Sequence, residues 1–338
     1  MAYITLNKSA FFHNLDIIAQ QTKSIDKIAL VLKDNAYGHG LLPMAKMAQE
    51  YGITKCVVRD ECEADEVSEY FNDILILSPR IYSDNQKFIY TINDYSDLEN
   101  IKYKDLNIAL KVDSGMHRNG VIVEELEDAL SCIEKSSLTL HSVFTHFRSA
   151  DSLSSEWFWQ NKNYHDIKKI VEEKFSKNVL FHAQNSAALF RTQTIEDWVR
   201  VGIAAYGCLE MDKTLLNEPL NFKPVLSLWG EKVSQKTLYH DNRVGYNGVG
   251  VVESDNTIVS NYDVGYADGF MRSASPHYTT PNGEKIVGRV SMDNSSFVSD
   301  KEELLIFDNA SIASEAMNTI SYELLVRLNE RLERRVCN

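Results

Sequence analysis

Short apolar runs alternate with amphipathic segments over the N-terminal two thirds of this 338-residue chain. Eight of these runs have the length and composition of buried strands, and helical periodicity lies between most of them. They cover residues 28–32, 55–58, 74–78, 88–92, 107–112, 138–145, 179–182 and 199–204. Strands that alternate with helices form parallel sheets, and eight such units close into a barrel. The pattern therefore predicts the α/β class, with an N-terminal (β/α)₈ TIM-type barrel.

Three segments have helical periodicity. Residues 124–133 and 152–175 are long enough for several turns. A further helix is expected near the N-terminus, where Asn7 or Ser9 suits the N-cap position. Its apolar positions are Phe11, Leu15 and Ile18.

The pattern changes near residue 220. Beyond it, β-rich runs follow one another with few helical patterns between them, at residues 225–233, 248–252, 286–292 and 296–299. The chain also exceeds the usual size of a single hydrophobic core, so two domains are expected. We predict a barrel over residues 1–220 and a mainly-β C-terminal domain over residues 221–338.

Bulk properties exclude several classes of protein. The net charge is −13, and no basic stripe is interleaved with aromatic residues, so nucleic-acid binding is not expected. No apolar run reaches membrane-spanning length, and the first residues lack an export signal, so a cytoplasmic protein is expected. The five cysteines are scattered without a Cys-x-x-Cys spacing, which predicts neither a metal site nor a disulfide framework.

Lys33 directly follows the first apolar run. A lysine buried at a strand end is costly unless its charge is paired or removed. A Schiff base with a conjugated carbonyl compound removes that cost, which makes Lys33 a candidate for covalent chemistry. The alternative is a lysine whose ammonium group simply reaches the surface.

The residues after Lys33 favour the first interpretation. Residues 33–40 read Lys-Asp-Asn-Ala-Tyr-Gly-His-Gly, which resembles the signature of the alanine racemase family of fold-type III enzymes. In that family the lysine carries pyridoxal 5'-phosphate (PLP). Further segments resemble family motifs in the family's order, at residues 111–120, 200–203, 244–246, 265–269 and 288–293.

The resemblance implies a set of cofactor-binding residues besides Lys33. Tyr37, Ser186, Gly202 and Ile203 would bind the phosphate, and His146 would lie beside the cofactor with His182 behind it. Barrels often hold a phosphate with the loops after strands seven and eight, which agrees with the positions of Ser186 and Gly202. Arg200 would face the pyridine nitrogen. A guanidinium can only donate, so that nitrogen stays unprotonated and the ring remains a weak electron sink. The alternative for Arg200 is a salt bridge with nearby Asp197.

Two cationic residues lie in the segment 111–120. By resemblance, Arg118 contacts the cofactor hydroxyl and the substrate carboxylate, a bidentate role that suits arginine. Lys111 corresponds to a lysine that is carbamylated in some family members. The alternative for Lys111 is an ion pair with a carboxylate inside the barrel.

Racemisation needs acid–base groups on both faces of a planar intermediate. The resemblance implies Lys33 on one face and Tyr246 on the other, with Tyr246 supplied by the partner subunit of a homodimer. It also places Met292 and Asp293 at the substrate. Channel positions are implied for Tyr266, Asp151, Arg272 and Arg289.

Three positions depart from the family pattern. An ungapped extension of the match at residues 319–323 places Glu330 where the family has a tyrosine near the phosphate. Arg148 stands where a small residue is expected, and Asn247 where glycine is expected. A carboxylate beside a phosphate would be repulsive, so either the C-terminal tail runs differently or the pocket is reshaped. Arg148 would narrow the entry or alter which side chain fits.

The resemblance implies a two-base racemase that interconverts L- and D-alanine through a PLP aldimine and supplies D-alanine for peptidoglycan. Broader specificity that includes serine stays open, because one extra group discriminates only weakly. An amino-acid decarboxylase on the same barrel is a second alternative, although Arg200 speaks against it. A non-enzymatic PLP carrier is a third, and it would not need the second domain.

Overall fold

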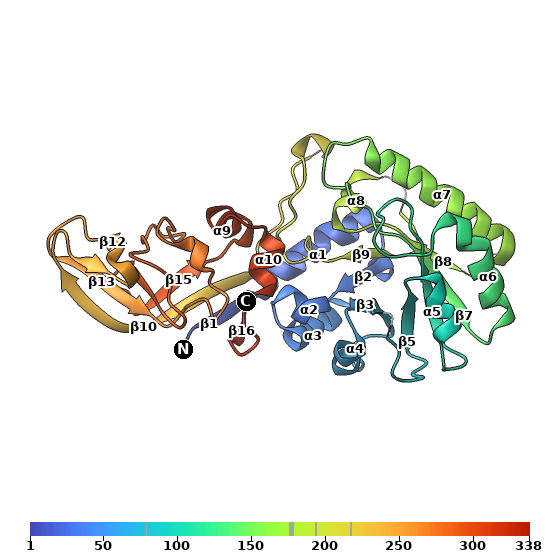
Figure 1. The fold of residues 1–338 in the computed structure, drawn as a ribbon, viewed down its shortest axis with the longest axis horizontal. Helices are drawn as coiled ribbons and strands as arrows, with labels where there is room; N and C mark the ends of the chain where they lie inside the picture. Colours follow the sequence, from blue (N-terminus) through green and yellow to red (C-terminus); the bar gives the residue numbers. More distant parts are fainter. Residues whose placement is uncertain (79, 176–178, 193–194, 217) are drawn as a thin grey trace.

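The computed structural model shows two parts, a barrel of alternating strands and helices and an elongated β domain (Figure 1). It describes residues 1–78, 80–175, 179–192, 195–216 and 218–338. Both chain termini lie at the β domain. Among the described residues, no helix is both long enough and apolar enough to cross a membrane.

Eight parallel strands form the barrel, in the order β8-β7-β6-β5-β4-β3-β2-β9. Their bounds are β2 (Ile28–Val31), β3 (Lys55–Val58), β4 (Asp73–Ile76), β5 (Phe88–Ile92), β6 (Asn107–Lys111), β7 (Thr139–Phe144), β8 (Leu180–His182) and β9 (Val199–Val201). No ladder joins β8 to β9 in the described part of the chain. Single backbone bonds bridge them instead, such as Arg200 N–H to the Gln184 carbonyl at 3.0 Å. The prediction of a barrel from eight apolar runs is confirmed.

The helices around the barrel follow the amphipathic pattern. They are α1 (Lys8–Thr22), α3 (Leu41–Tyr51), α4 (Glu61–Val67), α5 (Tyr95–Asn100), α6 (Leu126–Lys135), α7 (Glu156–Phe175) and α8 (Ser186–Arg191). The segment labelled α2 (Lys33–Tyr37) is a left-handed turn instead. The Asn7 side chain accepts a hydrogen bond from Ala10 N–H, so Asn7 and not Ser9 caps α1. Phe11, Leu15 and Ile18 are fully buried on the inner face of α1, as predicted.

The second domain is built on a six-stranded sheet with a small two-stranded sheet beside it. Its strands are β1 (Tyr3–Asn7), β10 (Leu226–Leu238), β11 (Arg243–Val244), β12 (Gly250–Val251), β13 (Thr257–Tyr262), β14 (Ser295–Val298), β15 (Glu303–Phe307) and β16 (Glu333–Cys337). Two short helices, α9 (Ala310–Ala316) and α10 (Ser321–Val326), stand between β15 and β16. The predicted run 286–292 forms no strand and has only an isolated bridge at Ile286, because Gly288 takes a positive φ there.

Strand β1 belongs to the second domain and not to the barrel. It pairs antiparallel with β10 and parallel with β16. The prediction that assigns residues 1–220 to the barrel is therefore wrong for its first seven residues. A five-residue strand with buried Ile4 and Leu6 fits either sheet, and only long-range pairing decides between them. The division near residue 220 itself stays a prediction.

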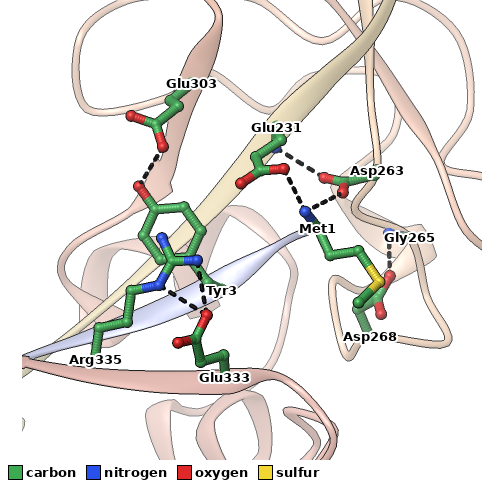
Figure 2. A network of polar contacts seen from close by, with 9 residues as sticks. All are labelled: Met1, Tyr3, Glu231, Asp263, Gly265, Asp268, Glu303, Glu333 and Arg335. Atoms are coloured by element: carbon green, nitrogen blue, oxygen red, sulfur yellow. Dashed lines mark hydrogen bonds and ion pairs between the residues drawn. The ribbon is translucent and has the colours of Figure 1, made fainter.

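A polar network fixes β1 in this sheet (Figure 2). The Met1 amine is paired with Glu231 on β10 and lies 3.4 Å from the Asp263 carboxylate. Farther along β1, the Arg335 guanidinium of β16 stacks 3.7 Å from the centre of the Tyr3 ring. The N-terminal strand is thus held by contacts to its two neighbours and to the loop after β13.

Candidate active site

Lys33 begins a left-handed turn two residues beyond the end of β2. The next four residues, Asp34, Asn35, Ala36 and Tyr37, have φ values from 52 to 55°. Such a conformation costs about 1–2 kcal/mol per residue with a side chain, less for Asn and Asp. A run of this kind survives only where the surroundings hold it, and it marks a functional site more often than a structural one.

The Lys33 side chain is half-buried at the carboxyl end of the barrel strands. Its exposed fraction is 37%, and its Nζ lies 4.0 Å from the Asp34 carboxylate. The side chain is thus neither fully buried nor fully exposed, and the role of Lys33 as a Schiff-base lysine stays a prediction. Its position after the first barrel strand agrees with the barrel prediction.

Hydroxyl and amide groups converge at the other end of the same turn. The Ser186 hydroxyl accepts from the N–H groups of Gly202, at 3.1 Å, and Ala204, at 3.3 Å. A Cβ atom on Gly202 would lie 2.6 Å from the Tyr37 hydroxyl, so only glycine fits. Ile203, between the two amides, is buried. We call the hydroxyls of Ser186 and Tyr37 together with the loop 202–204 the cradle. The two hydroxyl protons can be donated to an anion and glycine leaves room for it, so the residues present fit the phosphate of PLP.

Arg200 is buried on β9, next to this cradle. Its Nη1 donates to His182 Nδ1 at 2.7 Å, and its Nη2 donates to the Thr145 carbonyl at 2.6 Å. Burial lowers the pKa of Arg200 to about 10, so it remains charged at neutral pH. No ion pair joins Arg200 to Asp197 among the described residues, and the salt-bridge alternative is wrong.

His182 has one tautomer that satisfies both of its neighbours. Because Arg200 donates to Nδ1, the proton lies on Nε2, which donates to the Ser142 hydroxyl at 3.0 Å. The ring stacks on Phe144 with centroids 4.9 Å apart. Burial, followed by the charge of Arg200, lowers the pKa of His182 far below its usual value, so it stays neutral and fixes the guanidinium.

Four positive charges surround His146 at the barrel mouth. The pKa of His146 is lowered to about 3, first by burial and then by these charges. They belong to Arg200, Arg118, Lys111 and Lys33. The pKa of Lys111 is lowered to about 8, again by burial first and by Arg118 second. Such a concentration of cations favours a ligand with several negative charges.

The second-domain residues lie elsewhere in this chain. Tyr246 stands between β11 and β12, and β12 lies at the end of the molecule away from the barrel (Figure 1). Its side chain is 60% exposed, with the Arg272 guanidinium 6.0 Å from its ring centre. Met292 and Asp293 are also exposed. Tyr266 and Arg272 line one cavity of about 410 Å³. Within one chain, Tyr246 and Lys33 therefore lie in different parts of the molecule.

Two further channel candidates lie apart from each other. Arg289 is half-buried, and its backbone packs against Gly245, next to Tyr246. Asp151 is exposed in the barrel part, and its carbonyl accepts from Asp212 N–H at 2.8 Å. The structure thus groups Arg289 with the second-domain set and Asp151 with the barrel mouth.

The aromatic neighbour of the cradle is Tyr322 and not residue 330. The rings of Tyr322 and Tyr37 have centroids 5.9 Å apart. Burial, followed by the charge of Asp151, raises the pKa of Tyr322 to about 12. Glu330 is exposed on the segment before β16. Placing Glu330 beside the phosphate is wrong, because the tyrosine inside the matched segment 319–323 already occupies that place.

The other two departures have local explanations. Arg148 is paired with Glu156 on α7, and its guanidinium lies 6.0 Å from the ring centre of Trp159. It therefore contacts the outer helix. Asn247 has φ 59°, a left-handed conformation that asparagine tolerates better than most residues with a side chain. Asparagine can thus replace glycine after Tyr246 without rebuilding the turn.

Sequence reasoning missed three residues that support the turn after Lys33. Tyr206 is fully buried, donates to the Val31 carbonyl at 2.8 Å and packs against Tyr37. Glu63 and Arg334 contact the turn from opposite sides. Their sequence surroundings carry no motif, and only the contacts in the folded chain identify them. The described residues hold no cluster of His, Cys, Asp or Glu suited to a metal ion.

Comparison with known proteins agrees with this geometry. The family models "Alanine racemase, N-terminal domain" and "Alanine racemase, C-terminal domain" match residues 6–210 and 225–336. Alanine racemase of a Nitratiruptor species is 45% identical, and that of Campylobacter jejuni serotype O:2 is 41% identical, each over 99% of both chains. The structure of alanine racemase from Bacillus anthracis with bound L-Ala-P superposes with a TM-score of 0.88 at 26% identity. That superposition covers 100% of this chain and 95% of the other.

The family models cover both parts of the molecule, and the similar proteins match it over nearly its whole length. This chain therefore belongs to the alanine racemase family of PLP-dependent amino-acid racemases, whose general function is to supply D-alanine for peptidoglycan.

Proposed function

We propose that this chain binds PLP at the barrel mouth and interconverts L- and D-alanine with two bases, Lys33 and Tyr246. The observation that carries this proposal is that one short turn holds both the Lys33 amine and the Tyr37 hydroxyl. Lys33 begins the left-handed turn, and Tyr37 ends it against the Gly202 cradle. An amine at one end of a short segment and a proposed phosphate site at its other end suit a phosphorylated aldehyde.

Each part of PLP has a matching set of residues at the barrel mouth. Tyr37, Ser186, Gly202 and Ile203 would bind the phosphate through hydroxyls and amides, with His146 beside the ring and Lys33 at the aldehyde carbon. When bound, PLP supplies a conjugated ring that takes up the electrons left when the α-proton is removed. The chain's part is to orient that ring and to move the proton.

Arg200 decides how strongly the ring can act as an electron sink. Its two Nη atoms are held by His182 and by the carbonyl of Thr145. A guanidinium fixed in this way would donate to the pyridine nitrogen of PLP and could not protonate it, so that nitrogen would stay unprotonated. This arrangement favours simple proton removal and return. It disfavours the decarboxylase alternative, in which an acidic residue protonates that nitrogen.

Charge balance supports the substrate class. Lys33, Lys111, Arg118 and Arg200 bring four positive charges to one mouth. A phosphate and a substrate carboxylate on Arg118 would offset most of them. Among the described residues no carboxylate lies within ion-pair distance of Lys111, although the charge of Asp113 acts on it from farther away. The pKa of about 8 leaves part of the Lys111 amine unprotonated at neutral pH. We propose that this amine takes up carbon dioxide, and the resulting carbamate would orient Arg118.

The second base comes from a second copy of the chain. Tyr246 is exposed and lies in the domain away from its own barrel mouth. Apolar side chains are exposed in the same domain, and they include Val249, Val251, Tyr266 and Met292. Several exposed apolar side chains in one domain are typical of a surface that binds another protein. We propose a head-to-tail homodimer in which Tyr246, Met292 and Asp293 complete the partner's site, with Tyr266, Arg272 and Arg289 lining its access channel and Asp151 on the barrel side.

Cytoplasmic D-alanine supply for peptidoglycan is the proposed role. The test is a chiral assay of the purified protein with added PLP, using both enantiomers of alanine and serine. Interconversion of the alanines would support the proposal, and the serine rate would define the substrate range. Release of carbon dioxide without racemisation would refute it.

A further inference from the structure

The barrel side of the left-handed turn is held by one carboxylate. Glu63 on α4 accepts from Asn35 N–H at 2.9 Å through Oε1 and from Arg59 N–H at 2.8 Å through Oε2. Arg59 in turn donates to the Asp34 carboxylate at 3.1 Å. Glu63 thus connects the second residue after Lys33 to the segment that follows β3. Both of its oxygens are used, so no neutral side chain of the same size can replace it fully.

The opposite side of the turn is held by the second domain. Arg334 on β16 donates from Nη2 to the Gly38 carbonyl at 2.9 Å. Its Nη1 donates to the Asn329, Glu330 and Leu332 carbonyls. Gly38 also lies so close to α10 that an added Cβ would overlap the Leu325 carbonyl. The end of the turn is therefore pressed against the domain that carries the C-terminal strand.

These contacts share a consequence for Lys33 and Tyr37. Both residues are on the turn, so a small shift of its backbone moves the amine and the phenol hydroxyl together. Consecutive left-handed residues relax when their partners are lost, because the right-handed and extended regions are lower in energy for residues with a side chain. Glu63 bonds the start of the turn and Arg334 bonds its end.

We infer that Glu63 and Arg334 are positioning residues that hold the left-handed turn, and through it the Lys33 amine, in register with the cradle. The hydrogen bonds of both side chains go to backbone groups. The inference rests on the proposed function of the site. It assigns a role to the second domain of the same chain, besides the tyrosine that this domain would offer to the partner.

The first test replaces Glu63 in the full-length holoenzyme. Glu63→Gln keeps the size but can accept only one of the two N–H bonds well. We expect amide exchange in residues 33–41 to rise about tenfold, since a charge-assisted bond is lost. We also expect kcat to fall about tenfold or more with little change in KM, because misplaced reacting groups slow the chemical step. Glu66→Gln, on the exposed side of α4, is the matched control and should change neither.

The second test replaces Arg334. Arg334→Lys keeps the charge but cannot donate to Gly38 and to the three other carbonyls at once. We expect faster exchange at residues 38–41 and the same fall in kcat, with exchange in the barrel strands unchanged. Arg331→Lys, on the exposed part of the same segment, is the control. Should one variant fail to fold, the other still tests the inference.

The outcomes separate this inference from the proposed function. Faster exchange confined to the turn, with lower kcat, supports it. Unchanged exchange and kcat in both variants overturns it, as does a uniform loss of stability with kcat intact. If the wild-type protein racemises no amino acid, the proposed function fails, and turn exchange alone then decides whether Glu63 and Arg334 hold the turn.

Discussion

The barrel mouth and the exposed edge of the second domain contribute to the proposed site in opposite ways. At the mouth, Arg200, His182 and Ser186 are buried and hydrogen-bonded to other groups of the same chain. At the edge, Tyr246 and Met292 are 60% and 54% exposed. Preorganised groups need no rearrangement when they bind. Under the proposed function, the comparison means that one chain would supply the residues that hold the cofactor but only one of the two bases at its own site.

The largest expected effect comes from the barrel half. Lys33→Ala would remove both the proposed anchor of the cofactor and one of the two proposed bases, so racemisation should fall at least about 10⁴-fold. Borohydride reduction followed by peptide mass analysis should label the wild-type protein at Lys33. A label on Lys111 or on another lysine would contradict the proposed anchor.

The next effect comes from the second-domain half. Tyr246→Phe should lower α-proton exchange with L-alanine about 10²–10⁴-fold, and exchange with D-alanine much less, since the two bases serve opposite faces. Proton exchange into each enantiomer, followed by NMR, measures both. Equal losses for the two enantiomers would argue against two opposed bases.

A mixing experiment tests directly whether two chains share one site. Lys33→Ala and Tyr246→Phe chains, unfolded and refolded together, form mixed dimers with one intact and one doubly defective site. Random pairing then restores about one quarter of wild-type activity, as expected for a twofold assembly. Activity that stays at the sum of the separate variants would show that each chain uses its own tyrosine.

A smaller effect, on the affinity for PLP, is expected when a methyl group is added at Gly202. Gly202→Ala places a methyl group 2.6 Å from the Tyr37 hydroxyl, so the ring or the loop must move. Overpacking of this kind costs about 1–3 kcal/mol, and PLP affinity should fall about tenfold or more. Titration of PLP absorbance measures the affinity. Unchanged affinity would place the phosphate elsewhere.

The smallest effect concerns the charge of Lys111. Its pKa is about 8 in the folded chain and 10.5 in its ordinary state, so the unfolded chain binds more protons between these values. The stability contribution of this group therefore rises as the pH increases from about 8 to 10.5. In carbon dioxide-free buffer, Lys111→Met should flatten that rise in urea unfolding curves. An identical pH dependence in both proteins would show that Lys111 is not desolvated.

The two halves also differ in how well the sequence predicts them. The apolar runs predict the barrel strands closely, because a strand buried on both faces must be apolar throughout. In the second domain, the prediction of a strand over residues 286–292 is wrong, because Ile286 forms only an isolated bridge. Apolar residues there are buried in turns as well as in strands, so composition alone does not tell the two apart. The place of Tyr322 beside Tyr37 is also missed, because sequence alignment alone does not report spatial contact.

The sequence by itself determines which residues are available for the chemistry and their order along the barrel, since strand periodicity and the motif around Lys33 are local properties. Only the tertiary structure decides that β1 joins the second sheet, that His182 fixes Arg200, and that Glu63 and Arg334 hold the turn. Each of these pairs residues far apart in sequence. Such contacts depend on chain closure and mutual burial, which no local pattern encodes.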